Sequence, residues 1–144
     1  MLVTARTRIP SYEQIEMDLN LKDIVRGAIS VLCDEGYCHV DFRKYKCDNF
    51  IKMFKDNFSE ERLSQFFIIS NDQGAKNIFI IDCSQIKMIS KKFEEQIVPG
   101  RSEFINIYFP SNLKCPIKLF DHEISDFEKF LKNLGRYDLL LNLK

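Results

Sequence analysis

Residues 66–135 form a succession of strand-like segments that ends in one amphipathic helix, and this pattern limits the fold more than any other part of the chain. Two apolar runs, 66–70 and 77–82, flank a polar loop at 71–74 that contains a glycine. Such a loop between two apolar runs predicts a β-hairpin. Because both runs are almost continuously apolar, we expect both strands to be central in a sheet and covered on both faces.

Further strands are predicted after this hairpin. Residues 103–109 alternate between two faces, and Pro110 ends the run because proline has no N–H to donate to a neighbouring strand. One face of this strand would carry Ile105, Ile107 and Phe109. Shorter candidates for strands are residues 87–90 and 117–120.

The last predicted element is a helix that packs on the sheet. Residues 125–128, with Ser125 and Glu128 at their ends, have the spacing of a capping box, and Gly135 stands where a left-handed residue would end the helix. The apolar stripe between them consists of Phe127, Phe130, Leu131 and Leu134. A helix of this length is unstable alone in water, so we expect the stripe to be buried against the sheet.

The N-terminal half is predicted to be mainly helical. Capping-box spacing at Ser11 favours a first helix, and a regular apolar stripe over 21–36 favours a second, with Gly36 as its end. Residues 37–43 alternate and predict one strand. Asp48 would cap a third helix. The stripe of that third helix would be Phe50, Ile51, Phe54 and Phe58.

Separate helices and an antiparallel meander predict an α+β fold. A chain of 144 residues is expected to form a single domain over 1–144. It would have a mainly helical part at 10–58, with one strand at 37–43, and a part at 63–135 in which an antiparallel sheet of about five strands is closed by the C-terminal amphipathic helix. The order of elements over 63–135 resembles pleckstrin-homology-like modules, but the helical N-terminal part does not fit that pattern, and no family is assigned.

The 21 basic and 21 acidic residues balance, so the chain has no overall field that would hold a polyanion. Residues 1–6 do not resemble the start of a secretion signal, and no apolar run approaches the length of a membrane span. The five cysteines are an odd number. We therefore expect a cytoplasmic protein with reduced thiols and no membrane span.

One group of residues has the side-chain types of a zinc site. These residues are Cys33, Cys38, His39 and Cys47. The spacing contains no CxxC pair, and the adjacent Cys38 and His39 would point to opposite faces of a strand. Buried structural cysteines are the simpler interpretation, and we expect no metal and no cofactor.

Two arrangements could support catalysis. Cys83 follows a predicted strand, as a nucleophile can, and the only histidines that could act as its base are His39 and His122, but nothing in the sequence brings them together. The outward residues of the strand at 37–43 are Tyr37, His39, Asp41 and Arg43. They resemble an acid–base cluster, yet the solvent face of an edge strand looks the same. No catalytic residue is assigned.

Lysines and aromatic residues are interleaved over 44–55, as on surfaces that bind nucleic acid. The lysines are Lys44, Lys46, Lys52 and Lys55, and a second small cluster is Lys87, Lys91 and Lys92. The phenylalanines between them fall on the predicted apolar stripe, so we expect them in the core and the lysines on a solvated surface. Nucleic acid is therefore not an expected partner.

These observations favour a non-catalytic intracellular protein that binds and inhibits another protein, for example an immunity protein that blocks the active site of a basic toxin or nuclease. The candidate partner-binding residues are Glu13, Glu16 and Asp18, with no basic residue between Pro10 and Leu21. A helix dipole alone also explains acidic residues near a helix start. The alternatives are a small enzyme that uses a Cys/His/Asp cluster, or a pleckstrin-homology-like module that binds lipid or nucleic acid.

Overall fold

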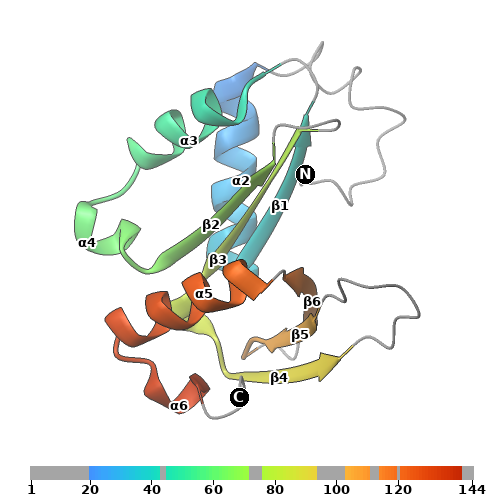
Figure 1. Cartoon of the computed structure of the whole chain (residues 1–144). Helices are drawn as coiled ribbons and strands as arrows, with labels where there is room; N and C mark the ends of the chain where they lie inside the picture. The colour runs from blue at the N-terminus through green and yellow to red at the C-terminus, as the bar shows by residue number, and fades with distance from the viewer. Residues whose placement is uncertain are drawn as a thin grey trace. The chain divides into compact units, whose positions relative to one another are not determined.

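The structure is a computed structural model that describes residues 20–42, 45–71, 76–93, 103–110, 114–119 and 121–140 (Figure 1). Contacts between residues divide the chain into two compact units, Met1–Asp82 and Cys83–Lys144. Both units combine helices with an antiparallel sheet, so the predicted α+β class is confirmed. The single domain over 1–144 stays a prediction.

The first unit contains one three-stranded antiparallel sheet. Its elements are α2 (Leu21–Glu35), β1 (Tyr37–Phe42), α3 (Cys47–Lys55), α4 (Glu60–Leu63), β2 (Phe66–Asn71) and β3 (Lys76–Asp82). The strand order is β1-β3-β2, with His39 opposite Phe79 and Ile68 opposite Ile80. The predicted hairpin is confirmed. Among the described strands of this sheet, however, only β3 has a neighbour on both sides. The prediction that both arms are central was therefore wrong for β2, because β1 pairs with β3 and not with β2.

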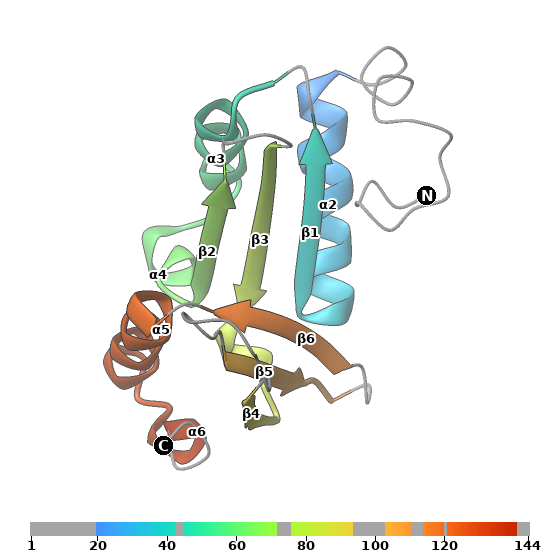
Figure 2. The same ribbon diagram turned by 45° about the vertical axis from the view of Figure 1, so that its right-hand side comes forward.

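Helices α2 and α3 lie on the same face of this sheet (Figure 2). The predicted stripe of α2 is buried at its centre, but Leu21 and Ile29 are half-buried and Val31, which was not predicted, is buried as well. The buried residues of α2 are Ile24, Val25, Ala28, Val31 and Leu32. From α3, Phe50 and Phe54 are fully buried against Ile78 and Ile80 of β3. The inward residues of β1, Cys38 and Val40, complete this core. One helix pair and one sheet face therefore make the hydrophobic core of the unit.

The ends of α2 follow from single residues. The side chain of Asn20 accepts a hydrogen bond from the backbone N–H of Asp23 at 2.9 Å, which satisfies one free donor at the helix start. Gly36 ends the helix with φ of +92°, as expected, and donates to the carbonyl of Leu32. The predicted cap of α3 was wrong: Lys46 is the N-cap without a side-chain bond, and Asp48 lies in the first turn.

The carboxylate of Asp82, at the end of β3, is fully buried. Arg62 of α4 donates to both of its oxygens, at 2.7 and 3.2 Å, and also donates to Gln65. The guanidinium carbon of Arg62 lies 4.7 Å from the ring centroid of Phe66, and the bond to Asp82 raises the pKa of the arginine above its usual value. The backbone N–H of Asp82 donates to the carbonyl of Gly36 at 2.8 Å. Arg62 thus connects α4 with β3 through Asp82 and with β2 through Phe66, and the backbone of Asp82 connects β3 with the end of α2.

Replacement of Arg62 by leucine should destabilise the first unit by roughly 3 kcal/mol, because it leaves a buried carboxylate without its counter-charge. The matched control is Arg26→Leu, which breaks an exposed pair with Asp23 at 3.7 Å and should cost about 1 kcal/mol or less. Chemical denaturation measures both. The double variant Arg62→Leu/Asp82→Asn should be more stable than Arg62→Leu alone. If the double variant and Arg62→Leu were equally stable, the loss of stability would not come from the unpaired charge of Asp82.

The second unit has its own three-stranded antiparallel sheet. Its elements are η1 (Cys83–Gln85), β4 (Met88–Phe93), β5 (Glu103–Tyr108), β6 (Lys114–Leu119), α5 (Asp121–Asn133) and α6 (Tyr137–Leu140). The strand order is β4-β5-β6. The prediction of one sheet of about five strands was therefore wrong, because β2 and β3 pair with β1 and not with the later strands. The sheet implied for 63–135 by the pleckstrin-homology-like order is likewise divided between the units.

The alternation predicted for β5 is confirmed, since Ile105, Ile107 and Phe109 are all buried. Strand β6 begins before the predicted segment and includes Pro116, which lies opposite Asn106. A proline is tolerated there because β6 is an edge strand and its missing N–H interrupts no second ladder.

Helix α5 begins at Asp121, so the predicted capping box was wrong and Ser125 lies inside the helix. The end was predicted correctly: Gly135 has φ of +82°. The next residue, Arg136, donates to the carbonyls of Cys83 at 2.9 Å and Ile86 at 2.7 Å. This arginine thus fixes the turn between α5 and α6 to the start of the second unit.

The members of the predicted stripe of α5 are not equally buried. Phe127 is fully buried, whereas Phe130 is half-buried. Phe127→Ala should lower the free energy of unfolding by about 3–5 kcal/mol, because it opens a cavity in the core. Phe130→Ala in the same helix should cost clearly less, and the exposed Lys129→Ala should cost little. Equal denaturation midpoints for the two phenylalanine variants would contradict this packing.

Candidate functional site

The structure describes some of the site residues predicted from the sequence and not others. Glu13, Glu16 and Asp18, proposed to bind a partner, lie outside the described residues, as does the predicted helix at Ser11. The side chain of His122 is also outside the described part, so whether it could act as a base for Cys83 stays untested.

Most of the described cysteines are buried. Cys38, Cys47 and Cys83 are in the core and Cys33 is exposed, and all four are free thiols. The thiol of Cys47 donates to the carbonyls of Asn71 and Asn77, both at 3.6 Å. These contacts assign Cys47 a structural role. Among the residues that the structure describes, no group of three His, Cys, Asp or Glu side chains could hold a metal ion.

Burial also changes the acidity of Cys38. Desolvation raises the pKa of its thiol from 9.0 to about 12, and a hydrogen bond with the backbone of Ile80 offsets only part of this effect. A thiol with so high a pKa is almost entirely protonated at neutral pH and is a poor nucleophile and metal ligand. Cys38 is therefore a core residue.

The raised pKa of Cys38 predicts how stability depends on pH. The folded state holds this proton more tightly than the unfolded state, so its contribution is complete below pH 9 and is lost as pH rises toward 12. The slope from this group is at most about 1.4 kcal/mol per pH unit. Denaturation curves at rising pH should show a shallower decline for Cys38→Ala than for the wild type. The control Val40→Ala, a buried neighbour without a proton, should lose stability but keep the wild-type slope.

The outward residues of β1 form an aromatic row with β3. The ring of Phe79 stacks with Tyr37 at 5.8 Å and with His39 at 5.2 Å between centroids. Nε2 of His39 lies 3.7 Å from Asp41. All of these side chains are half-buried. Because the rings stack on one another, part of the ring surface that a nucleic-acid base would need is already occupied.

The described lysine side chains of the two predicted clusters are exposed, as expected, while Lys44 and the side chains of Lys91 and Lys92 lie outside the described part. Lys46, Lys52 and Lys55 are exposed around α3, whereas Phe50 and Phe54 between them are buried. Lys87 in the second unit is also exposed. The aromatic residues that suggested a nucleic-acid surface thus belong to the core.

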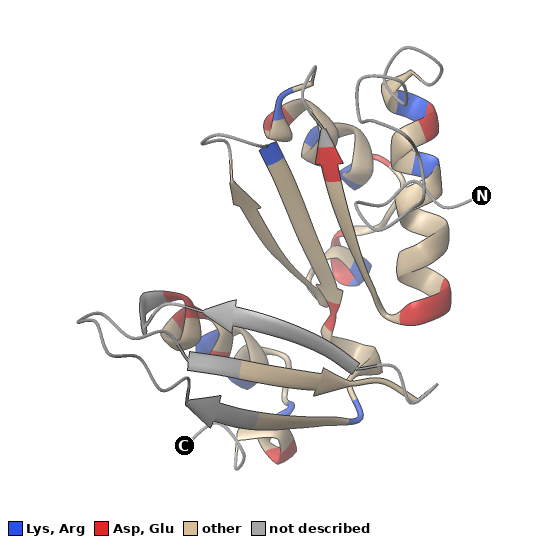
Figure 3. Cartoon of the chain, turned by 90° about the vertical axis from the view of Figure 1, so that its right-hand side faces the viewer, with Lys and Arg blue, Asp and Glu red and all other residues tan. Residues whose placement is uncertain are grey.

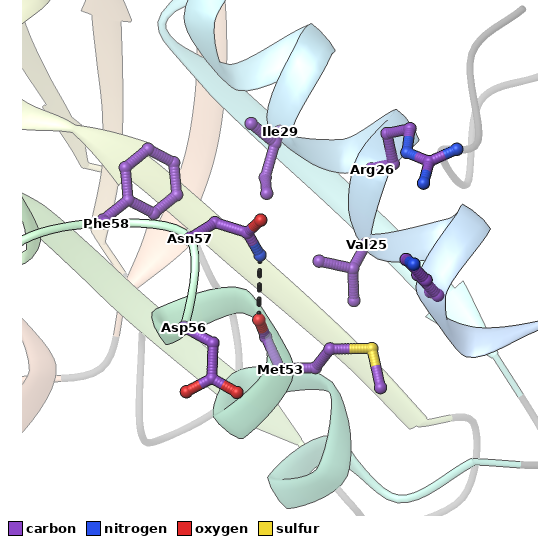
Figure 4. A pocket seen from close by; sticks show the side chains of 8 residues that line it. Val25, Arg26, Ile29, Met53, Asp56, Asn57 and Phe58 are labelled. Carbon is purple, nitrogen blue, oxygen red and sulfur yellow. Dashed lines mark hydrogen bonds between the residues drawn. The ribbon is translucent and has the colours of Figure 1, made fainter.

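A groove of about 480 Å³ lies between α2 and the end of α3 in the first unit (Figure 4). Its floor is apolar. The floor residues are Val25 and Ile29 of α2, Met53 of α3 and Phe58 just after α3. All except the buried Val25 are half-buried, so the groove presents apolar surface to solvent. Concave apolar surfaces of this size are typical of binding sites.

The rims of this groove are polar and differ in charge. Lys22 and Arg26 lie on the α2 side, and Asp56 lies on the opposite side with Asn57 (Figure 4). The charges of α2 gather at its two ends, and its middle carries none (Figure 3). The amide nitrogen of Asn57 donates to the carbonyl of Met53 at 2.9 Å, so this side chain caps α3 and fixes the second wall.

Sequence reasoning missed this groove. Its α2 residues lie on one helical face, but two of them, Lys22 and Arg26, are charged, so they do not form an apolar stripe of their own. Val25 and Ile29 belong to the stripe that was predicted as core. The second wall comes from residues 53–58, more than twenty positions later, and nothing local indicates that the two walls face each other.

Comparisons of this chain with models of protein families, with curated proteins and with solved structures gave no match. In the part of the chain that the structure describes, no helix has the length and apolar character needed to cross a membrane. The function is therefore inferred from the groove and from the burial and hydrogen bonding of the side chains that could react.

Proposed function

We propose that the protein is a non-catalytic binding protein that acts on another protein, as an immunity protein does when it blocks a toxin. The observation that carries this proposal is the groove between α2 and α3, with an apolar floor and charged rims. An apolar centre surrounded by polar residues is the usual composition of a protein–protein interface. Apolar side chains of a partner that fill the floor would supply most of the binding energy.

The condition of the candidate reactive groups favours binding over catalysis. Cys38, Cys47 and Cys83 are buried, and the carboxylate of Asp82 is fully used by Arg62. A nucleophile must be accessible and close to a base. Cys33 is the exposed thiol among those described, and it lies on the surface of α2.

The proposal places the protein in the cytoplasm, where thiols stay reduced. Four free cysteines support this location. The acidic residues Glu13, Glu16 and Asp18 remain candidates for a second contact, in which they would attract a basic partner such as a nuclease.

Affinity capture from the native host tests this function. The full chain should retain a specific protein, and Ile29→Glu should lose it because a charge in the floor prevents apolar contact. The matched control is Ser30→Glu, an exposed change on the same helix that should bind like the wild type. Circular dichroism and thermal unfolding establish that both variants are folded.

If the captured protein is an enzyme, its activity should fall to zero at one equivalent of the wild-type chain. Capture that is equal for wild type, Ile29→Glu and Ser30→Glu would exclude the groove as the binding site. Turnover of a small substrate by the purified chain would contradict the non-catalytic proposal itself.

A further inference from the structure

The lining residues of the groove extend along two turns of α2. Lys22, Val25, Arg26 and Ile29 follow one face of α2, and seven positions correspond to a rise of about 10 Å. Met53 and Phe58 form the other wall along this length. A helix that lies between two such walls can insert an apolar stripe of two turns, as in other complexes in which a helix binds in a groove.

The charges across the groove are opposite in sign. The α2 rim carries Lys22 and Arg26, both exposed, and the other rim carries the exposed Asp56. Arg26 has an ion pair with Asp23 at 3.7 Å. Because both of these side chains are well exposed, that pair is weak and can be exchanged for a partner's carboxylate.

We propose that the groove binds one amphipathic helix of a partner protein, with acidic residues along the flank that faces Lys22 and Arg26 and a basic residue along the flank that faces Asp56. This inference rests on the proposed function and specifies its partner. The charges also fix the direction of the helix. A helix turned end to end keeps its apolar stripe on the floor but exchanges its flanks, so that acid would face Asp56 and base would face Lys22 and Arg26.

A display library of helical peptides of about 14 residues, selected on the full chain, tests this chemistry. The selected peptides should carry apolar residues at i, i+4 and i+7, acidic residues on one flank and a basic residue on the other. The double variant Lys22→Glu/Arg26→Glu should bind these peptides about tenfold more weakly. It should bind peptides with exchanged flanks better than the wild type does, and Ile29→Glu should bind neither.

Cys33 allows the direction to be measured. It is exposed and lies one turn beyond Ile29 on α2. A chloroacetyl group on one end of a selected peptide alkylates a nearby thiol, forming a C–S bond and releasing chloride and a proton. Only one end of a given peptide should label Cys33, and a peptide with exchanged flanks should label it from its other end. As a control, Cys33→Ser should not be labelled by either end of the peptide, which shows that the label is on Cys33.

The outcomes separate the two proposals. Peptides that need Ile29 but show no charge pattern, or that label Cys33 equally from both ends, would overturn the inference about the helix and leave the binding function intact. If no peptide depends on Ile29, the groove binds no helix and the inference is wrong, while affinity capture with the wild type and Ile29→Glu still decides the proposed binding function. A last outcome is that the peptides bind only to the triple variant Glu13→Gln/Glu16→Gln/Asp18→Asn. The acidic residues of this chain would then compete with the peptides for the groove, and a partner helix would be excluded as its occupant.

Discussion

The buried carboxylate of Asp82 is the constraint on which the first unit depends. It stands at the end of the central strand, where an unpaired charge would be costly. Arg62 compensates this charge and at the same time covers Phe66 of β2. The backbone of Asp82 binds Gly36, the residue at which α2 turns into β1. The ion pair therefore ties α4 to the end of β3, and the backbone of the same aspartate ties the end of α2 to that strand.

The groove lies where one face of α2 is opposite the end of α3. Phe50 and Phe54 are fully buried in the core of the first unit, whereas Met53 of the same helix is half-buried and lines the groove. The cap that Asn57 supplies to α3 stops that helix beside α2 and does not let it continue over the floor. The groove thus lies where the buried face of α3 gives way to its half-buried and exposed residues at the end of the helix.

Local patterns in the sequence predicted the elements well and their pairing poorly. The stripe of α2, the glycine at its end, and the alternation of β1 and β5 all come from periodicity and from single-residue chemistry, and these agree with the structure. The choice of pairing partner depends on residues far apart in the chain. β1 pairs with β3 across two helices, and β4 begins a second sheet only a few residues after β3 ends. No local signal distinguishes that arrangement from one continuous meander.

The same limit explains the missed site. Sequence reasoning looked for reactive groups, but the described reactive groups are largely used in the structure: Cys47 binds backbone carbonyls and Asp82 binds Arg62. The groove consists of ordinary aliphatic and aromatic residues that differ from core residues only in being half-buried, and burial is a property of the packed chain. Recognition by shape and rim charge leaves no chemical motif in a sequence. A groove of this kind therefore becomes visible only in the packed chain, where the exposure of each side chain is defined.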